Sequence, residues 1–447
     1  MRCANYLPFD DYKNTKMIRY TLLSLLLVMT SALLAQQTPA PPQKQAIMIT
    51  GATAHLGNGQ RSENSIITFE NGKITTVGDS RSNQPAPGKN FRIIDATGKH
   101  LYPGFIAPST NLGITEIDAV RATRDFREVG NINPNVRALV AYNTDSRVSP
   151  TVRSNGILLI QVTPQGGWFS GQSSVVQLDA WNWEDAVVKA DDGVHLNWPR
   201  YFGRSGWWAN PGTISKNKDY DQHRREIESF LLEAQAYLRS EPSMPNLKFE
   251  AMRGVLEGDR KLYVHADGLK EMTNVIDLCD RLEITPVIVG GRDAWRMADV
   301  LKEKSIPVIL RKVQSLPGRE DNDIDQPFKT ARLLHEAGVD FCFSMGGAWE
   351  QRNLSFQAGQ AVAYGLDKEA AIAALSGNTA RIMGIDDRTG SLEVGKAATL
   401  FISAGDALDM RTCKVEQAFI DGREIDLDNK QKALSRKFRK KYADPER

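Results

Sequence analysis

Histidine is the side chain best suited to bind a metal or to move a proton near neutral pH, and this chain has 6 of them. They are scattered as His55, His100, His195, His223, His265 and His335. Only His265 ends an apolar strand-like run, Leu262-Tyr263-Val264-His265. His195 lies in a segment with loop-like composition, from which it can reach a site, although a solvent-exposed histidine is the simpler interpretation. No group of His and Cys residues in the sequence has zinc-finger spacing.

Charged residues follow several predicted strands and form a second candidate set: Asp267, Arg292, Asp293, Arg311 and Lys312. Arginine and carboxylate side chains can hold a carboxylate or amide ligand through charge-assisted hydrogen bonds. We therefore predict that His265, Asp267, Arg292 and Asp293 bind substrate. The alternative is a structural network of ion pairs at the strand ends.

The segment 164–174 is rich in glycine and carries Trp168 and Phe169. Its glycines permit close approach of the backbone to a ligand, which the two aromatic rings could cover. The segment lacks the Gly-Lys-Ser/Thr ending of a phosphate-binding loop.

The elements that position these residues alternate between strands and helices. Apolar runs at 156–162, 262–265, 286–289 and 306–310 predict buried strands, and amphipathic patterns predict helices over 221–238, 269–281, 294–304 and 327–337. Such alternation is typical of parallel strands covered on both faces. It favours a closed (β/α)8 barrel of TIM type, with an open doubly wound sheet as the alternative.

Both ends of the chain have β character. Residues 46–49, 65–69 and 73–77 predict a small antiparallel sheet, with Asn71-Gly72 as a two-residue type I′ turn. Strand-like segments return at 390–392, 398–402 and 418–422. The basic segment 430–447 is most simply a solvated terminal helix or tail, with a nucleic-acid-binding arm as the alternative.

Composition restricts the class of protein. With 447 residues, 41% hydrophobic and 25% charged, the chain is neither disordered nor a multi-span membrane protein. Its 56 Lys and Arg against 54 Asp and Glu leave a net charge of +2, which does not suggest a nucleic-acid partner. Of the 4 Cys, we expect those after the leader to be mostly buried free thiols, with one disulfide as the alternative.

A targeting signal is expected near the start. Met17-Ile18-Arg19 resembles a basic n-region, and Tyr20–Leu34 is an apolar stretch before Ala35. This pattern predicts a signal peptide cleaved after Ala35 and hence an exported, periplasmic or extracellular protein. An uncleaved membrane anchor is the alternative. Residues 1–16 are unlike a targeting region, so we expect translation to start at Met17.

Three groups of motifs carry a resemblance to a known family. The first includes Glu70-Asn71-Gly72-Lys73-Ile74 and Leu101-Tyr102-Pro103-Gly104-Phe105-Ile106; the second includes Asn378-Thr379-Ala380-Arg381 and residues 390–396; the third is Phe419-Ile420-Asp421-Gly422-Arg423. In this order they resemble the amidohydrolase superfamily, in its imidazolonepropionase-like and dihydroorotase-like branch. The resemblance implies a β/α barrel, here 106–385, with a small β-sandwich from 45–105 and 386–429. Residues 1–35 would then be the leader, 36–44 a linker and 430–447 a basic tail.

In that family a divalent metal activates water for hydrolysis. A His-x-His pair after the first barrel strand and histidines after strands five and six bind it, and an Asp after strand eight acts as ligand and base. This chain departs from the pattern, because Ser109 and Asn111 stand at the His-x-His positions and Met345 stands at the Asp position. Strand six ends without a histidine, so only His265 remains. We expect no metal, and zinc or another divalent ion only if the family chemistry survives.

Two functions follow from this resemblance. The family implies a hydrolase of carbon–nitrogen bonds other than peptide bonds, here with a degenerate metal site. The alternative is an inactive homologue that binds a ligand or partners an intact amidohydrolase. We expect a small-molecule or peptide-derived substrate, a homo-oligomer or hetero-oligomer, no nucleic acid, and no membrane contact after cleavage of the leader. The residues do not identify a catalytic group.

Overall fold

The computed structural model describes residues 37–81, 90–207, 209–240 and 244–443. The leader expected at residues 17–35 lies outside these ranges. Within them, no helix is both long and apolar enough to cross a bilayer. The described residues contain two large sheets, each of 8 strands, and one two-stranded hairpin.

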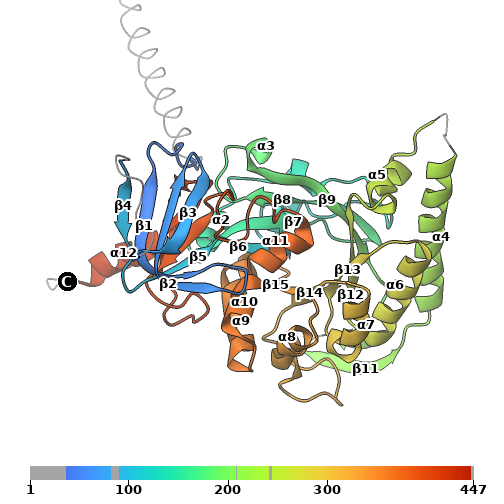
Figure 1. Cartoon of the computed structure of the whole chain (residues 1–447). Coiled ribbons are helices and arrows are strands. Elements are labelled where there is room, and N and C mark those ends of the chain that lie inside the picture. Colours follow the sequence, from blue (N-terminus) through green and yellow to red (C-terminus); the bar gives the residue numbers. More distant parts are fainter. Residues whose placement is uncertain (1–36, 82–89, 208, 241–243, 444–447) are drawn as a thin grey trace, which may run out of the picture. The chain divides into compact units, whose positions relative to one another are not determined.

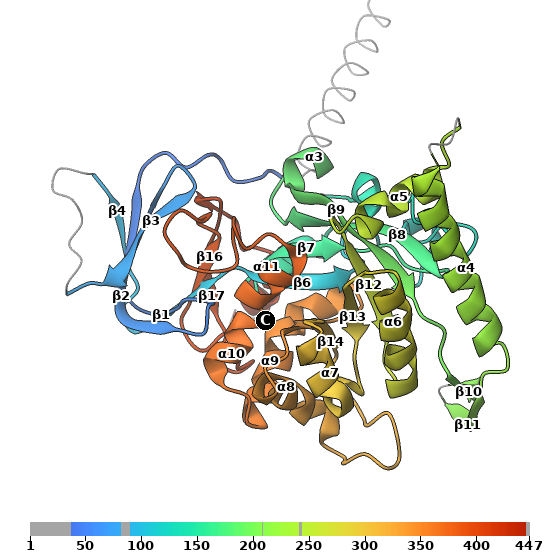
Figure 2. The ribbon, with the colours of Figure 1, turned by 45° about the vertical axis from the view of Figure 1, so that its right-hand side comes forward.

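The first sheet joins the two ends of the chain, as Figure 2 shows for the blue strands and the red strands β16 and β17. Its strands are β1 (Ile47–His55), β2 (Arg61–Glu70), β3 (Lys73–Asp79), β4 (Arg92–Asp95), β5 (His100–Pro103), β16 (Leu400–Ser403), β17 (Val415–Ile420) and β18 (Arg423–Glu424). The ends meet where β5 pairs antiparallel with β16. Asn71 and Gly72 both have positive φ in the β2–β3 turn, which confirms the predicted hairpin.

The small antiparallel sheet predicted from residues 46–49, 65–69 and 73–77 is confirmed by β1, β2 and β3, and further strands extend it. β4 and β5 both run parallel to β1. β2 and β3 occupy one edge of β1. The chain therefore returns to the other edge of β1, where β4 and β5 pair with it. The apolar faces of this sheet bury Ile49, Ile67, Phe69 and Phe419 completely or almost so.

The second sheet forms the barrel, in the order β15-β14-β13-β12-β9-β8-β7-β6. Its strands are β6 (Phe105–Thr110), β7 (Ile157–Val162), β8 (Phe169–Gln177), β9 (Val187–Asn197), β12 (Lys261–Ala266), β13 (Pro286–Gly290), β14 (Val308–Arg311) and β15 (Phe341–Ser344). The Ser344 hydroxyl donates to the Pro108 carbonyl oxygen at 2.8 Å, so the first and last strands approach each other and the barrel nearly closes.

One strand departs from the regular β/α pattern. β8 runs antiparallel to both β7 and β9. Only residues 163–168 connect β7 to β8, which is too short a segment for a parallel crossover. The TIM-like barrel fold is confirmed, with a three-stranded meander in its first half.

Helices cover the outside of the barrel, as Figures 1 and 2 show for α6 to α9. The helices are α2 (Ser149–Arg153), α3 (Trp183–Ala186), α4 (Tyr220–Arg239), α5 (Leu247–Leu256), α6 (Leu269–Arg281), α7 (Ala298–Glu303), α8 (Gln326–Glu336), α9 (Leu354–Ala363), α10 (Lys368–Ala373), α11 (Gly377–Met383) and α12 (Lys430–Tyr442). The helix predicted over 294–304 begins as a 3-10 turn and becomes α-helical at Ala298. The hairpin of β10 (Phe202–Trp207) and β11 (Asn210–Lys216) lies between β9 and α4 in sequence.

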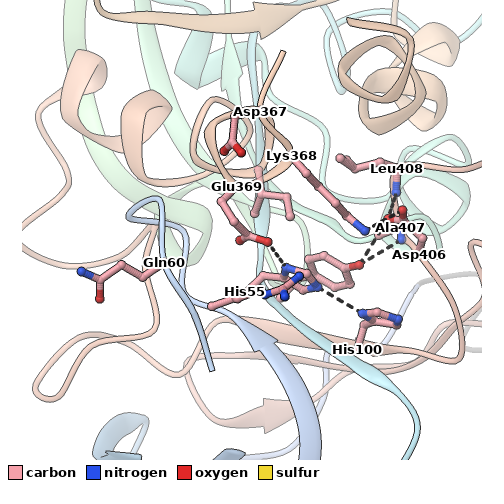
Figure 3. A network of polar contacts seen from close by, with 12 residues as sticks. His55, Gln60, His100, Asp367, Lys368, Glu369, Asp406, Ala407 and Leu408 are labelled. Atoms are coloured by element: carbon pink, nitrogen blue, oxygen red, sulfur yellow. Dashed lines mark hydrogen bonds and ion pairs between the residues drawn. The ribbon is translucent and has the colours of Figure 1, made fainter. Parts of the chain in front are cut away.

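A buried polar cluster joins the first sheet to the barrel (Figure 3). His55, at the end of β1, lies within hydrogen-bond distance of Glu369 on α10 (Nδ1 to Oε1, 2.8 Å) and of His100 on β5 (Nε2 to Nδ1, 3.1 Å). The His55 ring also stacks on Tyr102 with centroids 4.4 Å apart. We call His55, His100 and Glu369 the junction cluster. It connects strands from the N-terminal sheet to a barrel helix.

The predicted state of the thiols is confirmed for the described residues. Cys279 and Cys342 are buried free thiols, and Cys413 is partly buried and also free.

Candidate functional site

A cavity of about 550 Å³ opens at the end of the barrel where the parallel strands finish. Barrel proteins build their sites at this end. The cavity is lined by Ser109, Asn111, Thr163, Pro164, Gln165, Gly166, Gly167, Asn197, His265, Arg311, Gly346 and Gly347. We call this region the barrel mouth.

The first strand brings Ser109 and Asn111 to the barrel mouth through an irregularity. Pro108 has no N–H to donate, and Ser109 adopts a positive φ of 51°. The backbone N–H of Ser109 donates to the side-chain oxygen of Gln161 at 3.0 Å, which holds this conformation. Asn111 is 5% exposed, and its Oδ1 is buried without a hydrogen-bond partner among the described residues. This oxygen can accept an N–H from a ligand.

His265 lies between a second histidine and an arginine. Its Nε2 is 2.8 Å from His195 Nδ1, and its Nδ1 is 2.8 Å from the Arg311 guanidinium. Arginine can only donate, so His265 Nδ1 accepts and its Nε2–H donates to His195. His195 then carries its own proton on Nε2, a buried atom that has no partner among the described residues. We call His195, His265 and Arg311 the mouth triad.

Both imidazoles of the mouth triad are neutral. Burial, reinforced by the Arg311 charge, lowers the pKa of His195 to about 3. The same causes, together with His195, hold the pKa of His265 well below its ordinary value. Burial also lowers the pKa of Arg311, but an arginine stays charged at neutral pH.

The environment of Arg311 is open on the side that faces the cavity. The side chain lies deep in the barrel mouth, yet the residue is exposed because it faces the cavity. Among the described residues, no carboxylate lies within ion-pair distance of its guanidinium. The Asp267 charge raises the pKa of Arg311 and the Arg200 charge lowers it, so an acid and a second cation both face this region.

A buried polar network inside the barrel supports the mouth triad. Asp192 accepts hydrogen bonds from Gln161, Ser173 and Tyr263, each at 2.7 Å. The Tyr263 ring stacks on His195 with centroids 4.7 Å apart. Burial raises the pKa of Asp192 even though three donors stabilise its carboxylate. Asp192 therefore fixes Tyr263, and Tyr263 fixes the plane of His195.

The residues of the mouth triad do not fit a divalent metal. Zinc needs an unshared imidazole nitrogen, but one nitrogen of His265 accepts from Arg311 and the other carries a proton directed at His195. The Arg311 cation also repels a second positive charge at this position. Over the described residues, no three His, Cys, Asp or Glu side chains gather in a way that could hold a metal ion.

Of the four predicted substrate-binding residues, the structure places His265 in the cavity lining. Asp267 is half-buried nearby, and Gly290, which has no Cβ, leaves room for its carboxylate. Arg292 is exposed and packs against Gly318 instead of lining the cavity. The Asp293 carboxylate is buried and accepts the Leu269 N–H at 3.4 Å, at the start of α6. The structure brings His265 together with Arg311, and it directs Arg292 and Asp293 elsewhere.

Two expectations for nearby residues are wrong. His195 is not in a loop but on β9, where it is fully buried, because His195 and Asn197 point inward while Val194 and Leu196 point outward. Phe169 does not cover the cavity; it is fully buried and packs against Phe230. The alternation of Val194, His195, Leu196 and Asn197 was the signal that could have revealed a strand with a polar inner face. Met345 is buried directly after β15.

The sequence profile of the amidohydrolase family matches residues 265–425. A search of curated protein sequences finds no match. An amidohydrolase from Thermotoga maritima MSB8 has a similar structure, with a TM-score of 0.72, 24% identity, and coverage of 85% of this chain and 99% of that one.

Two further structures share the fold at lower similarity. A Xaa-Pro dipeptidase with bound methionine has a TM-score of 0.53 at 14% identity, with coverage of 85% of this chain and 100% of that one. An adenosine deaminase from Xanthomonas campestris with bound zinc has a TM-score of 0.51 at 16% identity, with coverage of 90% and 98%. The chain is thus similar to the amidohydrolase family over residues 265–425, and it shares its barrel fold with solved amidohydrolase structures.

Proposed function

We propose that this protein binds a small carboxylate-bearing ligand at the barrel mouth without a divalent metal, and that binding rather than hydrolysis is its function. The observation that carries the proposal is the hydrogen bond from Arg311 to His265. It puts a cation beside the one histidine that the family pattern retains, so the positive charge at the site comes from a side chain.

The donors and acceptors of the mouth define the ligand class. Arg311 has further N–H groups and faces the cavity, and a guanidinium matches the geometry of a carboxylate. Asn111 offers an unpartnered buried oxygen to an N–H group. An N-acyl amino acid or a dipeptide carries both groups. The structurally similar dipeptidase holds methionine, which is also an amino acid with a free carboxylate.

The arrangement does not favour amide hydrolysis. A general base needs a free lone pair near the attacking water. His265 Nδ1 accepts from Arg311, and His195 lies behind His265 and is fully buried. Ser109 lines the cavity, but no hydrogen bond joins it to His265, so the described residues do not form an activated nucleophile.

Metal-independent hydrolysis is the second candidate, and the family match over residues 265–425 favours it. It would require Arg311 to leave His265, so that His265 could accept a proton from water or from Ser109. The two candidates differ in one measurable respect, which is product formation from the bound ligand.

The test is a panel of N-acyl amino acids and dipeptides, each paired with its C-terminal amide, added to the protein in excess chelator. We expect thermal stabilisation by the acids and none by the amides, with every ligand recovered intact. Equal stabilisation by acids and amides would overturn carboxylate recognition. Release of the free amine would establish hydrolysis instead.

We also propose that the barrel mouth faces a partner protein, either a second copy or an intact amidohydrolase. Exposed apolar side chains on the segments that follow the barrel strands support this, including Val129 (95% exposed), Phe202 on β10 (55%) and Leu316 (82%). Export to the periplasm or the cell exterior remains a proposal from the leader pattern. Sedimentation of the purified chain tests self-association, and cell fractionation tests export.

A further inference from the structure

The last helix of the chain, α12, differs in charge from the rest of the molecule. Its 13 residues contain no Asp or Glu, and its cations are Lys430, Lys432, Arg436, Lys437, Arg439, Lys440 and Lys441. None of its residues is buried. The chain as a whole has a net charge of only +2, so this helix is a local concentration of positive charge.

An apolar stripe runs along one side of α12. Leu434, Phe438 and Tyr442 follow one another at four-residue spacing and therefore share a face. Helical geometry puts the uncharged Gln431 and Ser435 on the same arc and all seven cations outside it. The helix is thus strongly amphipathic, with a narrow uncharged face and a wide cationic one.

Within the part of the chain that the structure describes, the hydrogen bonds that join α12 to the barrel lie near its start. Asn429 caps α12 and donates to the Ser154 hydroxyl at 2.9 Å, and Thr151 donates to Gln431 at 2.9 Å. Beyond this first turn, the exposure of the stripe rises from 41% at Leu434 to 49% at Phe438 and 75% at Tyr442. Figure 1 shows α12 as the red helix next to the C-terminus mark. The apolar face is therefore accessible over its second half.

Most of the cations are available for an external partner. Arg436 pairs with Asp428, and Lys432 donates to the Leu427 carbonyl oxygen. Lys430, Lys437, Arg439 and Lys440 have no acidic partner among the described residues. Lys441 lies over the Tyr442 ring, with Nζ 5.1 Å from its centroid.

We propose that α12 binds the surface of an anionic phospholipid bilayer, with Leu434, Phe438 and Tyr442 inserted among the lipids. Clustered lysine and arginine are attracted to anionic headgroups, and an apolar stripe with aromatic rings enters the interface. Nucleic acid is the less suitable partner, because phosphate contacts need the cations but not an aliphatic and aromatic stripe. Such binding would hold the barrel at a membrane surface without a transmembrane span, contrary to the expectation from the sequence that the protein makes no membrane contact after cleavage of the leader.

The test uses the chain from Gln36 onward, which keeps every described residue and removes the apolar leader that could itself insert into lipid. It is mixed with vesicles of phosphatidylcholine alone or with 30% phosphatidylglycerol, an amount chosen on the order of natural anionic membranes. We expect at least ~10-fold more protein bound to the anionic vesicles. Truncation after Asn429 should abolish this difference and leave the thermal unfolding of the remaining chain unchanged.

Two variants separate the parts of the proposal. Phe438→Ser with Tyr442→Ser removes the stripe, and Lys437→Gln with Lys440→Gln and Lys441→Gln reduces the charge; we expect each to weaken binding several-fold. The matched control replaces three exposed lysines elsewhere, Lys248, Lys270 and Lys302, with Gln and should bind like the parent. Full binding by the truncated chain, or by the Phe438 and Tyr442 variant, would overturn the proposal. So would binding to single-stranded RNA in the absence of binding to anionic vesicles.

Discussion

The molecule contains two pairs of histidines. In each pair a nitrogen of one ring contacts a nitrogen of the other, and one of the two histidines also contacts a charged residue. In the junction cluster, His55 and His100 are 3.1 Å apart and end on the Glu369 carboxylate (Figure 3). In the mouth triad, His195 and His265 are 2.8 Å apart and end on the Arg311 guanidinium. The charges of Glu369 and Arg311 are opposite in sign.

The sign of the terminal charge decides what each pair can do. The Glu369 carboxylate accepts a hydrogen bond from the His55 Nδ1–H through Oε1, while its Oε2 is buried without a partner among the described residues. This charge is directed at a histidine inside the protein, which gives the junction cluster a structural role. Arg311 instead donates to His265, and its remaining donors face a cavity. The same arrangement of two histidines therefore stabilises a contact in one place and presents a cation to a cavity in the other.

The largest effect is expected from removing the cation of the mouth triad. Arg311→Met should weaken carboxylate binding about 10- to 100-fold, because it removes a charge-assisted hydrogen bond. Arg311→Lys should recover part of the loss, since it restores the charge without the planar fork. Titration calorimetry measures both.

The matched control is Arg292→Met, which replaces an exposed arginine that follows the neighbouring strand but does not line the cavity. It should bind like the parent protein. A loss with Arg292→Met and none with Arg311→Met would move the ligand site to the residues first predicted from the sequence.

The second prediction concerns acid stability. His195 has a pKa of about 3 in the folded protein against an ordinary 6.5, so the unfolded state takes up a proton first as the pH falls. Stability from this group is therefore complete above about pH 6.5 and is lost progressively towards pH 3, by about 2 kcal/mol between pH 7 and pH 5. Urea unfolding at both pH values measures the difference.

His195→Gln should flatten this pH dependence, because glutamine does not titrate and still offers an oxygen to His265. His335→Gln is the control, since His335 is exposed on α8. An unchanged pH slope in His195→Gln would show that His195 is not buried in its neutral form.

The third prediction addresses the junction cluster. Glu369→Gln keeps the shape but removes the charge that accepts from His55, and it should lower the free energy of unfolding by about 1–2 kcal/mol. Ligand affinity at the barrel mouth should not change. Glu336→Gln, in an exposed helical pair with Arg332, should cost less than about 0.5 kcal/mol. A fall in ligand affinity in Glu369→Gln would contradict the separation of the two histidine pairs.

The smallest effect is expected at Asn111. Asn111→Ala removes an oxygen that has no partner among the described residues, so stability should change little while ligand affinity falls about 5-fold. A competition assay against the parent protein resolves this difference. Strong destabilisation without loss of affinity would give Asn111 a structural role instead.

Much of the fold could be predicted because local rules and tertiary packing agree. Asn71-Gly72 forms the expected turn, and the helix at 269–281 has the predicted bounds because its apolar positions face the barrel. β9 was missed because Lys189, Asp191 and Asp192 hide its apolar alternation. The barrel interior contains the buried carboxylate of Asp192, so β9 does not show the usual alternation of apolar and polar residues.

The candidate site was predictable only in part. His265 follows an apolar run, so its place at a strand end was visible in the sequence. Its partners were not, because His195 and Arg311 come from strands on either side in the chain and meet only when these strands assemble into one sheet. Asp293, which was predicted to bind substrate, lies outside the cavity lining, and its Oδ2 accepts a backbone N–H at the start of α6.

We propose that Arg311 supplies at the barrel mouth the positive charge that a divalent metal supplies in amidohydrolases. It is tested most directly by titrating zinc into the metal-free chain and measuring carboxylate binding with and without chelator. We predict no zinc binding that depends on His265 and carboxylate binding that chelator leaves unchanged. One zinc per chain, lost in His265→Ala, together with ligand binding that chelator abolishes, would contradict the account.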